Sequence, residues 1–208
     1  MVRLWVFDPK GGMELSAGLP LYDRFFCDDF TAMADALEQA VHAMRERITR
    51  LRDDTRQHTP SVDEPLIVVV IDELATLTAY LTDRHAKDRI KAALGLLLTQ
   101  GRAAGFHVVA AVQDPRKEVL SFRDLFPTRI ALRLTEAPQV DLVLGDGMRD
   151  AGALCDRIPM SMPGVGYVVL DGDPTPSRLR ISYWSDPDIA ELAYTYGQLH
   201  PIEGGKAA

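Results

Sequence analysis

Leu66-Ile67-Val68-Val69-Val70-Ile71-Asp72-Glu73 is the stretch that decides the fold of this chain. Its first six residues form an unbroken aliphatic run, which is typical of a strand buried on both faces, as in a parallel sheet. Two carboxylates follow directly where the strand ends. They could begin a helix, as a cap and a first-turn acid. They would equally suit a site that binds a metal ion and activates water.

A buried strand that ends in Asp-Glu has the pattern of a Walker B motif. In this interpretation Asp72 holds Mg²⁺, directly or through water, and Glu73 polarises a water molecule for attack on a γ-phosphate. The strand by itself leaves this interpretation and the helix-start interpretation both open.

Bulk composition indicates an ordinary globular chain. With 208 residues, of which 47% are hydrophobic and 25% charged, it can bury the core of one domain. The formal net charge of −7 excludes a generally basic surface, although a few basic loops could still meet nucleic acid. Cys27 and Cys155 lack metal-site spacing and are expected to pack as small hydrophobic side chains. The apolar runs are too short to cross a bilayer.

Strands and helices alternate through the first half of the chain. The pattern predicts strands at 3–7, 66–72 and 108–112, separated by helices at 29–53 and 87–104. Such alternation favours an α/β fold whose mainly parallel sheet has helices on both faces. Further strands at 129–134, 166–170 and 178–183, with helices at 137–144 and 187–199, predict antiparallel strands at the C-terminal side.

Polar side chains follow three of the predicted strands. Asp8 and Lys10 come after the first, Asp72 and Glu73 after the second, and Gln113 after the third. Functional groups in such sheets gather where parallel strands end. If the three strands are neighbours, these groups share one crevice, which would suit hydrolysis of a nucleoside triphosphate.

Four segments carry a resemblance to a known family: WVFDPKGGMEL (5–15), LIVVVIDELATL (66–77), QGRAAGFHVVAAVQDPRKEV (100–119) and FPTRIALRL (126–134). In order and spacing they resemble the RecA-like P-loop NTPase motor domain of the FtsK/SpoIIIE DNA translocases. Within that group the resemblance is greatest to actinobacterial conjugative transfer proteins of the TraSA/TraB kind. It implies a hexameric, ATP-driven ring that moves double-stranded DNA, in conjugative transfer of a plasmid or integrative element or in chromosome partitioning.

The resemblance also implies roles for single residues. Asp72 becomes the magnesium residue, Glu73 the catalytic base and Gln113 the sensor of the γ-phosphate, with ATP and Mg²⁺ as cofactors. One arginine is expected to act across a subunit boundary, stabilising charge on the γ-phosphate of a neighbouring subunit. The candidates for that arginine finger are Arg102, Arg129 and Arg133.

The segment 114–126 lies where the family places a pore loop. Arg116, Lys117 and Arg123 are therefore candidates to contact DNA phosphates without reading bases. Glu118 and Asp124 dilute the positive charge of this segment, so an ordinary solvated loop remains an alternative.

A phosphate-binding loop of the GxxxxGK[ST] type occurs nowhere in the 208 residues. Asp8-Pro9-Lys10-Gly11-Gly12 does not replace it, because its lysine precedes the glycines. We therefore expect a partial motor domain at residues 1–199, without the P-loop strand and helix, followed by a flexible tail at 200–208. By itself the chain is expected to be inactive as an ATPase. It could be a fragment, a split gene product or a degenerate subunit.

Two alternatives to the translocase remain. The chain could be a non-catalytic subunit that docks on intact motor subunits, as the missing phosphate loop would allow. It could also be another P-loop NTPase, such as a secretion ATPase, although the DPK, GRAAG and PTRIA segments do not favour this. A cytoplasmic location is expected, with attachment to a membrane or septum only through other segments or partners.

Overall fold

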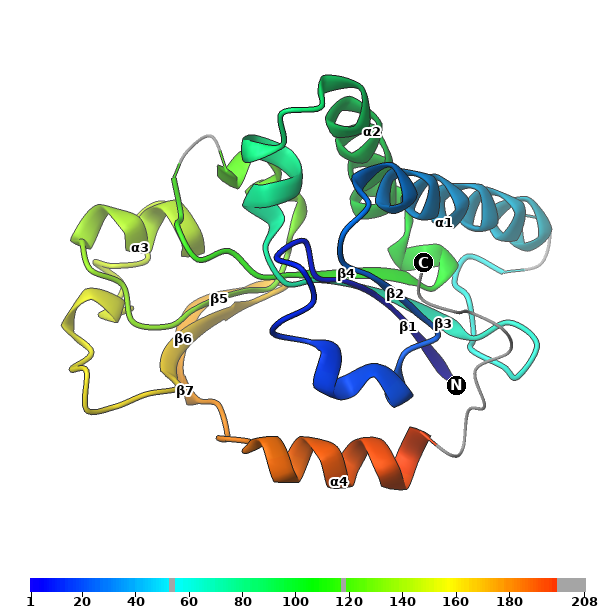
Figure 1. Cartoon of the computed structure of the whole chain (residues 1–208). Helices are drawn as coiled ribbons and strands as arrows, with labels where there is room; N and C mark the ends of the chain where they lie inside the picture. Colours follow the sequence, from blue (N-terminus) through cyan, green and yellow to red (C-terminus); the bar gives the residue numbers. More distant parts are fainter. Residues whose placement is uncertain (53–54, 117–118, 198–208) are drawn as a thin grey trace. The chain divides into compact units, whose positions relative to one another are not determined.

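A computed structural model describes residues 1–52, 55–116 and 119–197 (Figure 1). Within this part the chain forms two compact units. We call residues 1–113 and the segment that begins at Ser185 the parallel unit, and residues 114–184 the antiparallel unit. The extent of one motor domain, residues 1–199, stays a prediction. The predicted tail, residues 200–208, lies outside the described residues.

Four strands that all run in the same direction form the sheet of the parallel unit, in the order β2-β1-β3-β4. They are β1 (Val2–Phe7), β2 (Arg24–Phe26), β3 (Leu66–Ile71) and β4 (Phe106–Ala110). The aliphatic run of β3 suits an inner strand, since both of its faces are covered. The register pairs Phe7 with Ile71 and Ile71 with Ala110, so three strands end at the same level.

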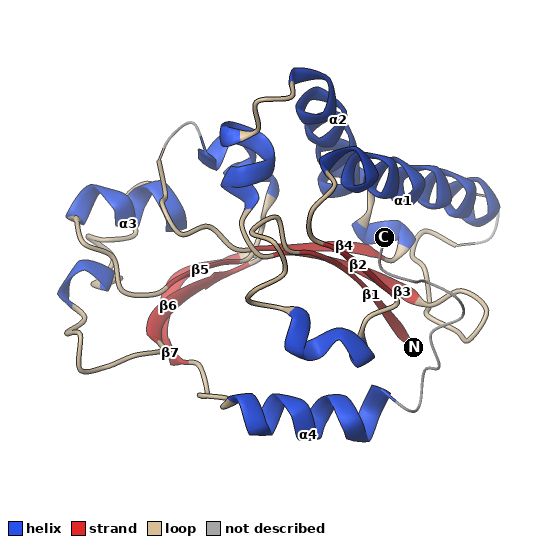
Figure 2. Ribbon diagram, viewed as in Figure 1, coloured by secondary structure: helices blue, strands red, loops and turns tan. Residues whose placement is uncertain are grey.

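Helical segments cover both faces of this sheet (Figure 2). On one face α1 (Phe30–Leu51) packs against α2 (Arg84–Gln100). On the other, the 3-10 helix η1 (Ser16–Leu21) contacts α4 (Asp186–Gly197). None of the helices in the described part of the chain is both long and apolar enough to cross a membrane.

Each of the two long helices begins at an aspartate. Oδ1 of Asp29 accepts the backbone N–H groups of the first turn of α1, and Oδ1 of Asp83 does the same for α2. Apolar residues then recur every three or four positions along α1, so that one face is buried against the sheet and α2. The buried apolar residues of α1 are Met33, Ala34, Ala36, Leu37, Ala40, Val41 and Met44.

A buried polar cluster joins α1 to the start of β4. Nη1 of Arg47 donates a 2.9 Å hydrogen bond to the carbonyl oxygen of Ala104. Nε2 of His58 lies 2.9 Å from the carbonyl oxygen of Glu64. Between them Gly105 has a φ of 74°, and a Cβ there would lie 2.2 Å from Cδ2 of His58. Both the backbone conformation and the space therefore require glycine at this position.

The antiparallel unit has its own sheet and its own small core. Its strands are β5 (Arg129–Ala131), β6 (Val165–Leu170) and β7 (Asp173–Arg180), in the order β5-β6-β7. Its helices are α3 (Ala137–Leu144) and the 3-10 helices η4 (Val119–Leu125) and η5 (Cys155–Arg157). The buried cluster consists of Ala131, Val140, Leu144, Ala153, Cys155, Ile158, Val165 and Val169.

Both cysteines are free, Cys155 buried in this cluster and Cys27 half-buried in the parallel unit. Burial raises the pKa of the Cys155 thiol to about 11. The thiol is therefore neutral near pH 7 and packs as a small hydrophobic group, as expected.

The predicted fold class is confirmed, with a parallel sheet, helices on both of its faces and antiparallel strands later in the chain. All seven strands and helices predicted between 3–7 and 137–144 are present within a few residues, as is the last helix. The last hairpin is also present, but its second strand begins at Asp173 and not at the predicted residue 178. Several short elements were not predicted, among them η4 and η5 of the antiparallel unit. The region expected to be a loop after β1 contains η1 and the three-residue strand β2, and residues Thr76–Tyr80 form a π-helical turn. Their short apolar stretches carry no clear period.

The stability of the parallel unit should fall with acidification because of His58. Burial lowers the pKa of His58 below its ordinary value, and the charge of Arg47 lowers it further. As the pH falls through about 6.5, His58 becomes protonated in the unfolded chain but stays neutral in the folded chain, so the folded state loses stability. The measurement is the urea midpoint between pH 7.5 and 5.5, followed by the fluorescence of Trp5 in a Trp184→Phe background.

His58→Gln should flatten this pH dependence. His42→Gln is the matched control, since His42 is an exposed residue of α1 that pairs with Glu46. An unchanged pH dependence in His58→Gln would show that another group causes it.

Candidate active site

The ends of β1, β3 and β4 form one edge of the parallel sheet, and backbone hydrogen bonds extend beyond the strands there. The N–H of Asp72 donates to the carbonyl oxygen of Phe7 (3.0 Å), and the N–H of Leu74 donates to that of Ala111 (2.9 Å). The Asp72-Glu73 pair is thereby fixed between the two neighbouring chain segments. The polar groups predicted to share a crevice do lie at one edge of the sheet.

Glu73 joins two of these segments with its carboxylate. The side chain is 6% exposed. Oε1 accepts the N–H of Ala75 at 3.1 Å, and Oε2 accepts the N–H of Gln113 at 3.0 Å. The first bond caps the helical turn that begins after the strand, so the helix-start interpretation is correct in part. An ionised carboxylate has roughly four lone-pair sites, so two remain that could orient a water molecule.

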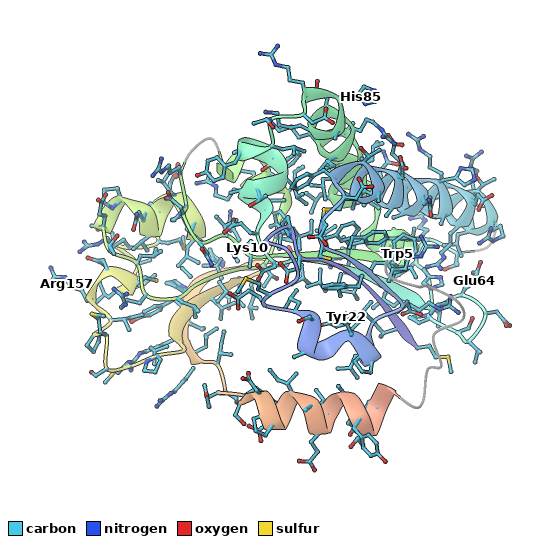
Figure 3. All side chains as sticks on the ribbon, viewed as in Figure 1. Trp5, Lys10, Tyr22, Glu64, His85 and Arg157 are labelled. Carbon is cyan, nitrogen blue, oxygen red and sulfur yellow. The ribbon has the colours of Figure 1, made fainter. Side chains whose placement is uncertain are left out.

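Asp72 faces a cation from the same chain. Nζ of Lys10 lies 2.9 Å from Oδ2 of Asp72, and Figure 3 shows Lys10 on the loop that follows β1. Apart from this ion pair, Oδ2 is buried and receives no well-directed hydrogen bond from the described residues. Burial acts to lower the pKa of Lys10, but the hydrogen bond and charge of Asp72, with the charges of Glu73 and Glu14, raise it above its ordinary value.

Asp8 fixes the loop that carries Lys10. We call residues 8–15 the Lys10 loop. Asp8 is fully buried, and its carboxylate accepts three backbone N–H groups: that of Lys10 (3.2 Å) on Oδ1, and those of Glu14 and Leu15 (both 3.1 Å) on Oδ2. The turn also needs φ values of 80° and 76°, which two successive glycines at 11 and 12 supply. The position of Lys10 is therefore determined by buried interactions.

The described residues around Asp72 fit a magnesium ion that is bound mainly through the phosphates of a substrate. Asp72 offers the hard oxygen ligand that Mg²⁺ prefers, and the Lys10 ammonium is the one group among the described residues that engages its buried Oδ2. No group of three or more potential ligands occurs among the described residues. Magnesium commonly binds through one or two carboxylates, water and substrate phosphates. Asp72 would supply the carboxylate in such an arrangement.

Gln113 and Arg102 lie at opposite ends of β4. Gln113 follows the carboxyl end, where it is exposed and its backbone N–H bonds Glu73. Arg102 is exposed in the 3-10 turn Arg102–Ala104, before the amino end of the strand. Five strand residues separate the two ends by roughly 17 Å. Arg102 therefore lies far from Asp72 and Glu73.

The other basic candidates belong to the antiparallel unit. Arg129 is partly buried and lies 3.9 Å from Asp124, whereas Arg133 is exposed. Arg123 donates to the carbonyl oxygens of the last turn of α3 at 3.2 and 3.3 Å, which satisfies the end of that helix. Arg116 is exposed and pairs with Asp114. Lys117 lies outside the described residues.

Sequence reasoning found the carboxylates but missed what surrounds them. The Lys10–Asp72 ion pair and the anchoring role of Asp8 were not predicted, although both residues were noted as strand-end groups. The available signal was an aspartate followed by proline and two glycines, a combination typical of a constrained turn. It does not reveal which strand end the turn will face.

Comparison with known proteins shows what the chain as a whole is similar to. No family model matches the chain. It is 26% identical over 211 residues to the DNA translocase FtsK of Staphylococcus aureus strain Mu50, covering 92% of this chain and 25% of the relative. The FtsK of Listeria monocytogenes is likewise 26% identical and covers 92% of the chain. The chain thus spans about a quarter of the length of these relatives.

Solved structures show the same fold. The conjugation coupling protein TcpA of pCW3, in a monomer form with ATPγS, matches with a TM-score of 0.75 and 22% identity over 93% of this chain and 56% of that one. The cytoplasmic domain of the type VII secretion ATPase EccC of Thermomonospora curvata gives 0.66 and 19% identity, covering 100% of this chain and 25% of that one. The resemblance to FtsK/SpoIIIE-type motor domains is confirmed. The closer resemblance to actinobacterial transfer proteins stays a prediction.

Asp8→Asn should destabilise the parallel unit by about 1–3 kcal/mol, because an amide group in place of one oxygen leaves buried N–H donors without an acceptor. The measurement is urea unfolding followed by Trp5 fluorescence in the Trp184→Phe background. Asp29→Asn is the matched control, since an exposed helix cap tolerates either side chain. Equal stability of the two variants would contradict the role given to Asp8.

Proposed function

We propose that this chain supplies the catalytic carboxylates of an ATP-driven translocase for double-stranded DNA, of the FtsK/SpoIIIE type. The observation that carries the proposal is the Asp72-Glu73 pair at the end of β3, with Glu73 bonded to the segment that carries Gln113. Its support from relatives is the similarity to FtsK over 92% of the chain.

Each residue has a chemical role in the proposed reaction. A magnesium ion bound by Asp72 would act as a Lewis acid toward the phosphates of ATP. Glu73 orients and deprotonates the attacking water, and the carboxylate is held in place by the two backbone N–H groups. Gln113, exposed beside Glu73, hydrogen-bonds the γ-phosphate or that water. Its backbone bond to Glu73 couples the two positions.

Phosphate binding requires residues that these 208 do not contain, since no GxxxxGK[ST] sequence is present. Among the described residues β4 pairs with β3 alone, so its other edge is free of strand partners. We propose that a segment carrying the phosphate loop completes the site. ATP binding and hydrolysis are assigned to that completed site and not to the isolated chain.

A non-catalytic subunit that docks on intact motor subunits is the second candidate. The missing phosphate loop favours it, whereas the built arrangement around Asp72 favours the catalytic role. A secretion ATPase is less favoured, because the likeness to EccC concerns the fold alone, at 19% identity. Activity in the presence of a phosphate loop separates the first two candidates.

The proposed assembly is a homo-oligomeric ring, with six subunits as the family implies. Arg102 is the preferred arginine finger, because it lies at the end of the parallel sheet remote from Asp72 and Glu73 of its own subunit. Arg116 is the preferred DNA contact, because it is exposed, whereas Arg123 is engaged at the end of α3. Lys117, Arg129 and Arg133 remain candidates. A cytoplasmic location and attachment to a membrane assembly through other parts are also proposals.

Glu73→Gln should abolish ATP turnover when the phosphate-loop segment is present. Loss of the base should lower DNA-stimulated hydrolysis at least about 100-fold while nucleotide binding persists. Phosphate release and binding of a fluorescent nucleotide measure the two properties. Glu46→Gln, on the exposed face of α1, is the control. Unchanged turnover in Glu73→Gln would refute the assignment, and robust turnover by the isolated 208-residue chain would show that the phosphate site lies elsewhere.

Mixed rings should identify the arginine finger. Subunits with Arg102→Ala keep Glu73, and subunits with Glu73→Gln keep Arg102, so their mixture rebuilds complete sites at some boundaries. We expect the mixture to recover activity that neither variant shows alone. The same mixtures with Arg129→Ala and Arg133→Ala test the other candidates. If a mixture with Arg129→Ala or Arg133→Ala recovers activity and the mixture with Arg102→Ala does not, the arginine finger is that other residue and not Arg102.

A further inference from the structure

The Lys10–Asp72 ion pair places a cation where the proposed metal ion would bind. Nζ of Lys10 lies 2.9 Å from Oδ2 of Asp72, and the two side chains are 27% and 18% exposed. A magnesium ion would lie at about 2.0–2.1 Å from a carboxylate oxygen. An ammonium and a divalent ion on the same oxygen would repel each other strongly in such a poorly solvated place. The two cations therefore compete for Oδ2.

Buried interactions hold this ion pair in place, unlike a chance contact on the surface. The buried carboxylate of Asp8 bonds the backbone of Lys10 and of the end of the Lys10 loop. A Cβ on Gly12 would approach Cβ of Cys27 to 3.3 Å, so the loop also packs closely against its neighbours. The backbone is fixed, whereas rotation about the bonds of the four-carbon side chain can still move the ammonium group.

We propose that Lys10 is a resident counter-ion of Asp72 that moves to the nucleotide when metal binds. In the free protein the ammonium neutralises Asp72 and keeps divalent metal away from it. When the nucleotide arrives with magnesium, the metal takes Oδ2 of Asp72, and the ammonium turns to an anionic phosphate oxygen. Metal and nucleotide therefore bind Asp72 together, and metal alone binds weakly. This inference rests on the proposed nucleotide site.

The charge balance around the pair favours such an exchange. Lys10 contacts Asp72, and the negative charges of Glu73 and Glu14 add to the attraction on its ammonium. A divalent ion that brings triphosphate adds net negative charge, and the displaced ammonium then has a strong new partner. Without the phosphate, the ammonium would have to leave Asp72 for water, which opposes binding of metal alone.

Binding of Mn²⁺ to the isolated chain tests the first half of the proposal, without nucleotide and without hydrolysis. The concentration of free Mn²⁺, read from its electron paramagnetic resonance signal, gives the affinity. Lys10→Met and Lys10→Gln should each bind Mn²⁺ about tenfold more tightly than the natural chain, since the competing charge is gone. Lys10→Arg should show no gain. Adding Asp72→Asn to Lys10→Met should remove the gain, which separates Asp72 from other acidic groups.

Nucleotide affinity tests the second half, with the phosphate-loop segment present. Lys10→Met should weaken binding of the magnesium complex of a non-hydrolysable ATP analogue by about tenfold, because the phosphate loses a cationic partner. The same substitution thus tightens metal binding and weakens nucleotide binding. A purely structural ion pair would not produce these opposite changes.

The two parts of the test fail independently of the proposed function. Equal Mn²⁺ affinity in Lys10→Met, Lys10→Gln and the natural chain would overturn the counter-ion role, even if Glu73→Gln abolishes hydrolysis. A gain that survives Asp72→Asn would overturn it as well. Loss of the whole proposed function would instead appear as no nucleotide binding by any variant, with the Mn²⁺ result unchanged.

Discussion

The common level at which β1, β3 and β4 end is the constraint on which the site depends. Parallel strands held in register bring their carboxyl ends to one edge, where side chains from distant parts of the sequence meet. Residues 8, 72 and 113 are far apart in the chain, yet they share this edge. The carboxylate of Glu73 then ties two of the three segments together through backbone N–H groups. A slip of one residue in either pairing would separate these partners.

The carboxylates of Asp8 and Asp72 lie at this edge but have different partners. Asp8 bonds backbone N–H groups, whereas Asp72 pairs with a lysine side chain. Asp8 is fully buried and its oxygens accept three backbone N–H groups, so it shapes the Lys10 loop. Asp72 is partly exposed and pairs with the ammonium of Lys10, the contact that the proposed exchange of cations would break. The difference arises because backbone bonds cannot be released without unfolding the loop, whereas a lysine side chain can turn away.

The proposed function accounts together for the likeness to FtsK translocases and for the absence of a GxxxxGK[ST] sequence, because the chain would supply one half of a nucleotide site. Half of a nucleotide site activates water and holds metal, and the other half holds the phosphates. In the proposed function, the arrangement around Asp72 and Glu73 is the first half. Sites of this kind need both halves, because a magnesium ion with one carboxylate has too few fixed ligands until substrate phosphates contribute theirs.

The sequence by itself determined the parallel α/β class and the helices α1, α2 and α3, and it marked Asp72, Glu73 and Gln113 as polar residues at strand ends, because each of these depends on a local pattern. An aliphatic run marks an inner strand, and a 3.6-residue period marks a helix. The sequence did not determine the strand β2, the π-helical turn at Thr76–Tyr80 or the pairing of Lys10 with Asp72. Only the tertiary structure decided these, since strand order and side-chain neighbours follow from long-range packing that leaves no periodic trace in the chain.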